Sequence, residues 1–114
     1  VAVSYPANPA GLGTQSMPNS LAGGTGGGFF EPIEIHFVDA STGAPTTVPA
    51  AGIWVADGPT NDVSVTFRDS SGAVITTVPP PPTSAFIGIA APIGIATMEL
   101  ATSNPDDFYV DDLH

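Results

Sequence analysis

Two kinds of residue are almost missing from this chain. It has no cysteine, and its 114 residues include a single Lys or Arg, Arg68. The absence of cysteine excludes disulfides, thiolate zinc sites and cysteine nucleophiles. With one fixed cation the chain cannot replace the counterions of nucleic acid or bind an anionic membrane surface, so neither is an expected partner.

Acidic residues supply nearly all of the charge. Eleven Asp and Glu give a formal net charge of −10, yet 42% of the residues are hydrophobic and the mean hydropathy is +0.25. This apolar content excludes disorder, and the length suits one domain with one modest core. A composition almost without Lys and rich in Gly, Ala, Thr, Ser and Pro fits a secreted bacterial domain. We therefore expect an extracellular or cell-surface location.

Alternating apolar residues predict short β-strands from Phe29 onward. Val63, Val65 and Phe67, for example, share one face of a strand. The turn sequence Asp69–Gly72 should join this strand to the next as a hairpin, and the run Pro79–Pro82 predicts an unpaired connector. The expected strands are Pro32–Val38, Gly52–Ala56, Val63–Arg68, Ala73–Val78, Phe86–Ile89, Ile93–Leu100 and Phe108–Leu113.

No window shows helical periodicity, so the sequence predicts an all-β fold, an antiparallel two-sheet sandwich that is jelly-roll-like. Residues 1–28 differ from the rest, because they are rich in Gly and Pro and no charged residue precedes Glu31. They are predicted to form an N-terminal Gly/Pro-rich arm and linker, with short strands at Val1–Tyr5 and Asn19–Leu21. The sandwich domain is then expected over residues 29–114.

The apolar stretch Ser84–Ala101 is long enough to raise the question of a membrane span. It contains Pro92 and Glu99, and its isoleucines alternate with smaller residues. Two sheet strands around a turn explain this pattern better than a membrane helix, so we expect no membrane insertion in this chain.

Seven segments follow one another in a characteristic order and spacing: Pro18–Leu21, Ile33–Val38, Gly52–Val55, Val63–Phe67, Asp69–Gly72, Phe86–Ile89 and Asp107–Leu113. In this order and spacing they resemble secreted bacterial β-sandwich domains found upstream of PEP-CTERM-type sorting signals. The resemblance covers residues 17 to 113 and implies a lectin-like or carbohydrate-binding jelly roll. The overall character of the chain is also similar to that of glycan-coated extracellular fibrils.

The chain departs from this pattern because the usual first strand, well before Pro18–Leu21, is not seen. In such sandwiches the first and last strands tend to be neighbours, so Phe108–Leu113 would have an open edge. Val1–Tyr5 could cover that edge, either folded back or donated to another copy. Donation between identical subunits does not close and builds a filament. The residues expected to mediate assembly are Val1, Val3, Tyr5, Phe108 and Val110.

The sequence offers no catalytic constellation. His36, Asp39 and Ser41 are close together in the chain, but in a strand His36 points away from Ile35 and Phe37 and should face solvent. We therefore expect a protein that is not an enzyme.

Carboxylates crowd the C-terminal end of the chain, where calcium could bind, since this ion takes carboxylate and carbonyl oxygens. The alternative is a solvated acidic rim that keeps the protein soluble. The candidate metal ligands are Asp106, Asp107, Asp111 and Asp112.

Aromatic and hydroxyl side chains suggest two contacts with glycans. Trp54 and Tyr109 could stack on sugar rings, although packing in the core is the favoured interpretation for Trp54. Ser and Thr with Pro are typical of O-glycosylated stalks, and ordinary strand and loop threonines are the alternative. The candidate O-glycosylation sites are Thr42, Thr46, Thr47 and Thr83.

Together these features predict a non-catalytic structural subunit of an extracellular bacterial filament or surface assembly. Copies would polymerise by strand exchange and carry O-linked glycans. The alternative is a carbohydrate-binding jelly-roll module of a larger secreted protein. The expected partners are other copies of the chain and glycans, covalent or bound, and calcium is the only cofactor considered.

Overall fold

The computed structural model describes residues 21–23, 32–57, 62–103, 108–111 and 113–114. These residues form strands and no helix, so this part of the chain has no helix that could cross a membrane. The strands are β1 Leu21–Gly23, β2 Ile33–His36, β3 Val48–Asp57, β4 Val63–Arg68, β5 Val74–Val78, β6 Ala85–Ile95, β7 Thr97–Thr102 and β8 Phe108–Asp111.

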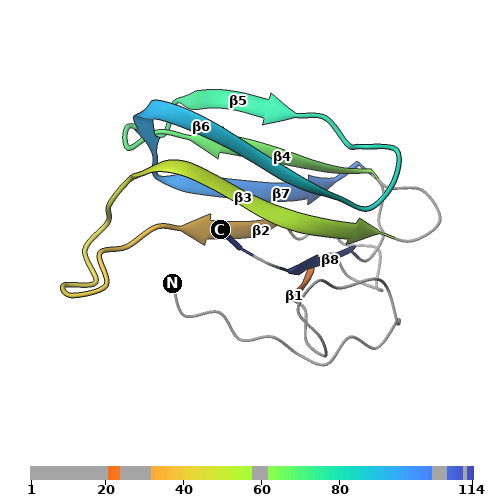
Figure 1. Cartoon of the computed structure of the whole chain (residues 1–114), viewed down its shortest axis with the longest axis horizontal. Coiled ribbons are helices and arrows are strands. Elements are labelled where there is room, and N and C mark those ends of the chain that lie inside the picture. Colours follow the sequence, from red (N-terminus) through yellow and green to blue (C-terminus); the bar gives the residue numbers. More distant parts are fainter. Residues whose placement is uncertain (1–20, 24–31, 58–61, 104–107, 112) are drawn as a thin grey trace.

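The strands build two four-stranded sheets, which face each other as layers (Figure 1). One sheet has the order β1-β8-β3-β6 and the other the order β2-β7-β4-β5, and all neighbours are antiparallel. The pairs β4–β5, β3–β6, β2–β7 and β1–β8 are nested one around the next along the chain. This is the topology of a jelly roll, so the predicted all-β sandwich is confirmed.

The core lies between the inner faces of the two sheets. Val63, Val65 and Phe67 alternate with half-buried residues along β4, and all three are fully buried. Val55 and Val110 are buried on the opposite sheet. The alternation that predicted the strands therefore also selects the core face.

The boundary between the last long strands differs from the prediction. Phe86–Ile89 and Ile93–Leu100 were expected to be separate strands, but β6 runs unbroken from Ala85 to Ile95 and β7 begins at Thr97. Pro92 does not end β6, because on an edge strand its missing N–H costs no hydrogen bond within the sheet. The chain changes sheets at Ala96, whose N–H donates to the Arg68 carbonyl (2.8 Å) and whose carbonyl accepts from Phe37 N–H (3.1 Å).

The last strand is not the open edge that the sequence predicted. β8 lies between β1 and β3, with Val110 paired to both Leu21 and Val55. The predicted open edge at Phe108–Leu113 is therefore wrong, because β1, three residues of weak strand signal, pairs with β8. β1 lies within residues 1–28, so the sandwich includes part of the predicted arm. Val1, Val3 and Tyr5 lie outside the described residues.

The chain continues beside β3 after β8. Gly52 and His114 exchange two backbone hydrogen bonds, each of 2.8 Å. Because Trp54 pairs with Asp111, regular pairing would place residue 113 opposite Gly52. The pairing with β3 therefore shifts by one residue between Asp111 and His114, and Leu113 packs against the core.

Gly94 offers a test of the path by which the chain enters Ala96. Its φ is +93°, and a Cβ there would lie 2.6 Å from Thr47 Oγ1 and 2.8 Å from Thr47 Cβ. Gly43 also has positive φ (+70°), but nothing lies within 4 Å of its Cβ position. We expect Gly43→Ala to lower the free energy of unfolding by about 1–2 kcal/mol, from backbone strain alone. Gly94→Ala should cost about 1–3 kcal/mol more from overpacking, as measured by urea denaturation. Equal losses would show that Thr47 does not contact residue 94.

Candidate functional site

The predicted metal site cannot be assembled from the described side chains. Asp106, Asp107 and Asp112 lie outside them, and Asp111 is known through its backbone pairing with Trp54. Among the side chains that the structure describes, no group of three or more His, Asp or Glu is arranged to hold a metal ion. Calcium binding at the C-terminal end thus stays a prediction.

The candidate glycosylation sites differ in their surroundings. Thr42, Thr47 and Thr83 are exposed, and Thr46 is half-buried. The Thr42 hydroxyl donates to Asp39 Oδ1 (3.2 Å) and accepts from Ala44 N–H (3.2 Å), so a glycan there would replace its donor hydrogen. O-glycosylation of these residues stays a prediction.

Trp54 does not pack in the core, contrary to the favoured interpretation. Its neighbours Ile53 and Val55 are 2% and 0% exposed and occupy the inner face of β3. By strand alternation the half-buried Trp54 lies on the outer face, paired with Phe86 of β6. Both faces of Gly-Ile-Trp-Val-Ala are apolar, so the sequence alone does not distinguish them.

A pair of glycines lies next to these aromatic residues. Gly52 and Gly88 are directly opposite each other in β3 and β6. The Phe86 ring covers Gly52, so that a methyl group there would overlap the ring, and His114 meets Phe86 edge-on at 5.9 Å between ring centroids. The ring of Phe86, on the edge strand β6, thus lies diagonally over a glycine of the inner strand β3. These residues line a shallow groove of about 410 Å³ with Ala50, Ala51, Ile89 and Ala90.

The β6 edge is the long open edge of the sandwich. β6 pairs only with β3 among the described residues, and β5 likewise pairs only with β4, so the terminal strands of both sheets lie along one side (Figure 1). This side carries Val74 (52% exposed), Phe86 (52%) and Ile93 (70%). No Asp, Glu, Lys, Arg or His occurs between Asp69 and Glu99, so both edge strands are uncharged.

Backbone parity identifies the groups that β6 presents at this edge. The N–H and C=O of Gly52 bond to His114, on the β8 side of β3. The backbone N–H and C=O groups of successive residues point to opposite sides of a strand. Those of Ile53 therefore point toward β6, where Ile53 pairs with Ile87. The groups of Phe86, Gly88 and Ala90 therefore point away from the sheet. Charge, proline and short length usually protect such an edge, and here only Pro92 does so.

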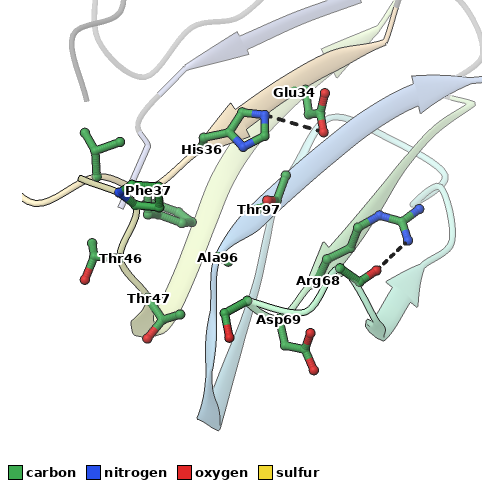
Figure 2. Close-up of a pocket in the computed structure, with 13 residues that line it drawn as sticks. Glu34, His36, Phe37, Thr46, Thr47, Arg68, Asp69, Ala96 and Thr97 are labelled. Atoms are coloured by element: carbon green, nitrogen blue, oxygen red, sulfur yellow. Dashed lines mark hydrogen bonds and ion pairs between the residues drawn. The ribbon is translucent and has the colours of Figure 1, made fainter. Parts of the chain in front are cut away.

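A second concave region, a groove of about 750 Å³, lies at the end of the sandwich where the chain crosses from β6 to β7 (Figure 2). Ala96 and Thr97 line its middle. The β2–β3 connection forms one wall and the β4–β5 hairpin the other, and Ala96 is hydrogen-bonded to residues of both. Polar groups of four elements converge here. The residues that line the groove include Glu34, His36, Phe37, Val38, Pro45, Thr46, Thr47, Arg68, Asp69, Ser70 and Thr97.

Each wall contains an aspartate turn, in which one aspartate carboxylate accepts several hydrogen bonds from the residues that follow it. Asp69 Oδ1 accepts from Ser71 Oγ (2.6 Å), Ser71 N–H (2.8 Å) and Ala73 N–H (3.1 Å), and Asp39 Oδ1 accepts similarly from Ser41 and Thr42. The hydroxyl bond from Ser71, followed by the backbone bonds, holds the pKa of Asp69 below its ordinary value of 3.8. The pKa of Asp39 is lowered first by the Ser41 hydroxyl. The walls are therefore preorganised by bonds to ionised carboxylates.

His36 faces solvent as predicted, with its side chain 62% exposed and Nε2 3.5 Å from Glu34 Oε1. Asp39 and Ser41, its neighbours in sequence, are bonded to each other within the turn. The sequence did not indicate the β6 edge or the place of Arg68 in a groove. The uncharged run between Asp69 and Glu99 was the available signal for the edge.

Comparisons of this chain with protein families, curated proteins and solved structures found no match. The class of the molecule is thus defined by its own geometry, an antiparallel jelly-roll sandwich with one uncharged open side. The resemblance to domains that precede PEP-CTERM-type signals stays a prediction.

Ser71→Ala tests the aspartate turn of the hairpin wall. Removing the hydroxyl should raise the pKa of Asp69 toward 3.8, measured by NMR titration of its carboxyl carbon. Ser70→Ala changes the same hairpin without removing a bond to Asp69 and should leave this pKa unchanged. Because the folded pKa is lowered, the carboxylate stabilises the fold above about pH 4, and this contribution is lost as the pH falls through the folded pKa. An unchanged pKa in Ser71→Ala would mean that the hydroxyl does not bind the carboxylate in solution.

Proposed function

We propose that this chain is a non-catalytic structural subunit of an extracellular bacterial assembly, and that its copies join by adding a strand to the β6 edge. The proposal rests on one observation. β6 is an uncharged strand of 11 residues, and in the described part of the chain it has a partner on one side only. An exposed, long and apolar edge is a template for pairing with another chain.

The charge distribution favours this surface for self-association. At a net charge of −10, two copies repel each other wherever their acidic residues approach. The acidic residues occur from Glu31 to Asp69 and from Glu99 to Asp112. β5 and β6 fall between these segments, so two copies can meet along this side without bringing carboxylates together.

The donor in this proposal is Val1–Tyr5 of another copy. The segment lies outside the described residues, and its sequence alternates Val1, Val3 and Tyr5 with the small residues Ala2 and Ser4. The large side chains would point inward, toward the partly buried residues at the open side of the core, which are Ile75, Val78 and Ile89. The acceptor is then β6, not β8 as first expected. Because the contact is heterologous, it extends to a filament.

Backbone pairing and apolar burial supply the stabilisation. Phe86, Gly88 and Ala90 present outward donors and acceptors, and each hydrogen bond contributes about 0.5–1.5 kcal/mol net. Burial of apolar side chains adds about 25 cal/mol per Å². Strand addition along β6 thus outweighs residual repulsion between subunits at moderate salt.

The extracellular location, O-linked glycans and calcium belong to the same proposal. The exposed Thr42 and Thr83 support glycan attachment. The acidic C-terminal end supports calcium binding only through its sequence. Mass spectrometry of native material and melting with and without chelator test these two parts separately.

Charge placed on the edge tests assembly. Ile93→Lys puts a cation on β6 and should convert filaments to monomers, as seen by sedimentation velocity and negative-stain microscopy. Ala90→Pro removes one outward N–H and should weaken assembly by the same route. Val38→Lys, at a site 38% exposed and outside β5 and β6, is the matched control and should assemble normally.

Deleting Val1–Tyr5 tests the donor segment separately from the acceptor edge on β6. The deleted chain should stay monomeric, and adding a Val1–Tyr5 peptide should protect β6 amides from hydrogen exchange. Filaments that persist after the deletion would refute strand donation. Disassembly by Val38→Lys would mean that added charge acts generally, not at the edge. A wild-type monomer retained on polysaccharide would support the binding-module alternative instead.

A further inference from the structure

Arg68 is the one fixed cation of the chain, set against eleven acidic residues, and it lies in the wall of the 750 Å³ groove. Its position in the sheet is fixed by pairing with Thr97 of β7 and Val74 of β5. The side chain is half-buried.

Most N–H donors of the Arg68 guanidinium form no hydrogen bond within the described structure. Its one hydrogen bond within the described structure runs from Nη1 to the Gly72 carbonyl at 3.3 Å, which is long for a charged donor (Figure 2). None of the described carboxylates lies within ion-pair distance of it. Asp69 is adjacent in sequence, but its Oδ1 is bonded to Ser71 and Ala73 in the turn.

The other side chains that line the groove suit a ligand with several hydroxyl groups. Hydroxyls come from Thr46 and Thr47 on one wall, Ser70 on the other and Thr97 between them. The exposed Val38 and Pro45 add an apolar patch beside the hydroxyls, and the buried Phe37 also lines the groove. Groups of this kind can bind the hydroxyls and the C–H face of a sugar ring. The bonds of Ala96 and the two aspartate turns hold the walls in place before a ligand arrives, which reduces the ordering cost of binding.

The charges in and around the groove limit the classes of ligand that it could bind. A neutral sugar would leave the guanidinium desolvated without a partner of opposite sign. A dianionic phosphate would meet one cation against Glu34, Asp69 and a net charge of −10. A single carboxylate matches the planar guanidinium bidentately.

We propose that this groove binds a uronate-containing polysaccharide segment, with a sugar carboxylate on Arg68 and sugar hydroxyls on the Thr and Ser side chains. The site is independent of assembly, because none of the β6 residues Ala85–Ile95 lines it. A carboxylate on a polypeptide has the same charge but lacks the ring hydroxyls that the threonines would bind.

The test titrates the full-length protein with trigalacturonate, with the matched neutral galactose trimer and with a short Asp/Glu peptide. Binding is followed by calorimetry and by the amide NMR signals of Ser70, Gly72, Ala96 and Thr97. We expect saturable binding of the uronate, at least about tenfold weaker binding of the neutral trimer, and no saturation with the peptide. Equal affinity for the two trimers, or preference for the peptide, would overturn the proposal.

Variants separate charge from structure. Arg68→Gln should weaken uronate binding at least about tenfold, and Arg68→Lys, which keeps the charge but not the fork, should weaken it less. Glu34→Gln removes a like charge from the groove and should strengthen binding. Glu99→Gln, on the same face of the sheet but outside the groove, should leave it unchanged. Unaltered affinity in a folded Arg68→Gln protein would refute the role of Arg68, and circular dichroism verifies the fold of each variant.

Discussion

The two backbone hydrogen bonds of Ala96 fix most of the arrangement of this sandwich. One residue carries the chain from one sheet to the other, and its N–H and C=O bind Arg68 and Phe37 on two different strands. β6 ends at this crossover, and β7 begins in the interior of the opposite sheet, between β2 and β4. The same crossover leaves β6 as an outer strand and forms the middle of the groove beside Arg68.

Most of the fold could be predicted from local pattern. The alternation in Val63–Arg68 gave the bounds of β4, and Asp69–Gly72 gave the hairpin turn. The path through Pro92 could not be predicted, since a proline disrupts a central strand but not an outer one. Sequence position does not reveal which of these a strand will be, and that depends on pairing between distant segments.

The functional surfaces were harder to predict for the same reason. The outward position of Trp54 depends on which of two apolar faces meets the second sheet. The closure of β8 depends on three residues, Leu21–Gly23, whose own strand signal is weak. Arg68 was visible as the sole cation, but its groove is built by three separate connections. Only the uncharged run before Glu99 could have suggested the β6 edge.

The nested pairing also bears on how the chain reaches this fold. Only β4–β5 joins segments adjacent in sequence, through the turn held by Asp69. Once that hairpin exists, the loop that β3 and β6 must close is shortened, and each outer pair gains in turn from the pair inside it. β1 and β8 come from nearly opposite ends of the described chain, so of the four nested pairs theirs has the longest loop to close. Such non-local closure gives slow folding, with β6 and the inner sheet faces exposed to other chains until the final pair forms.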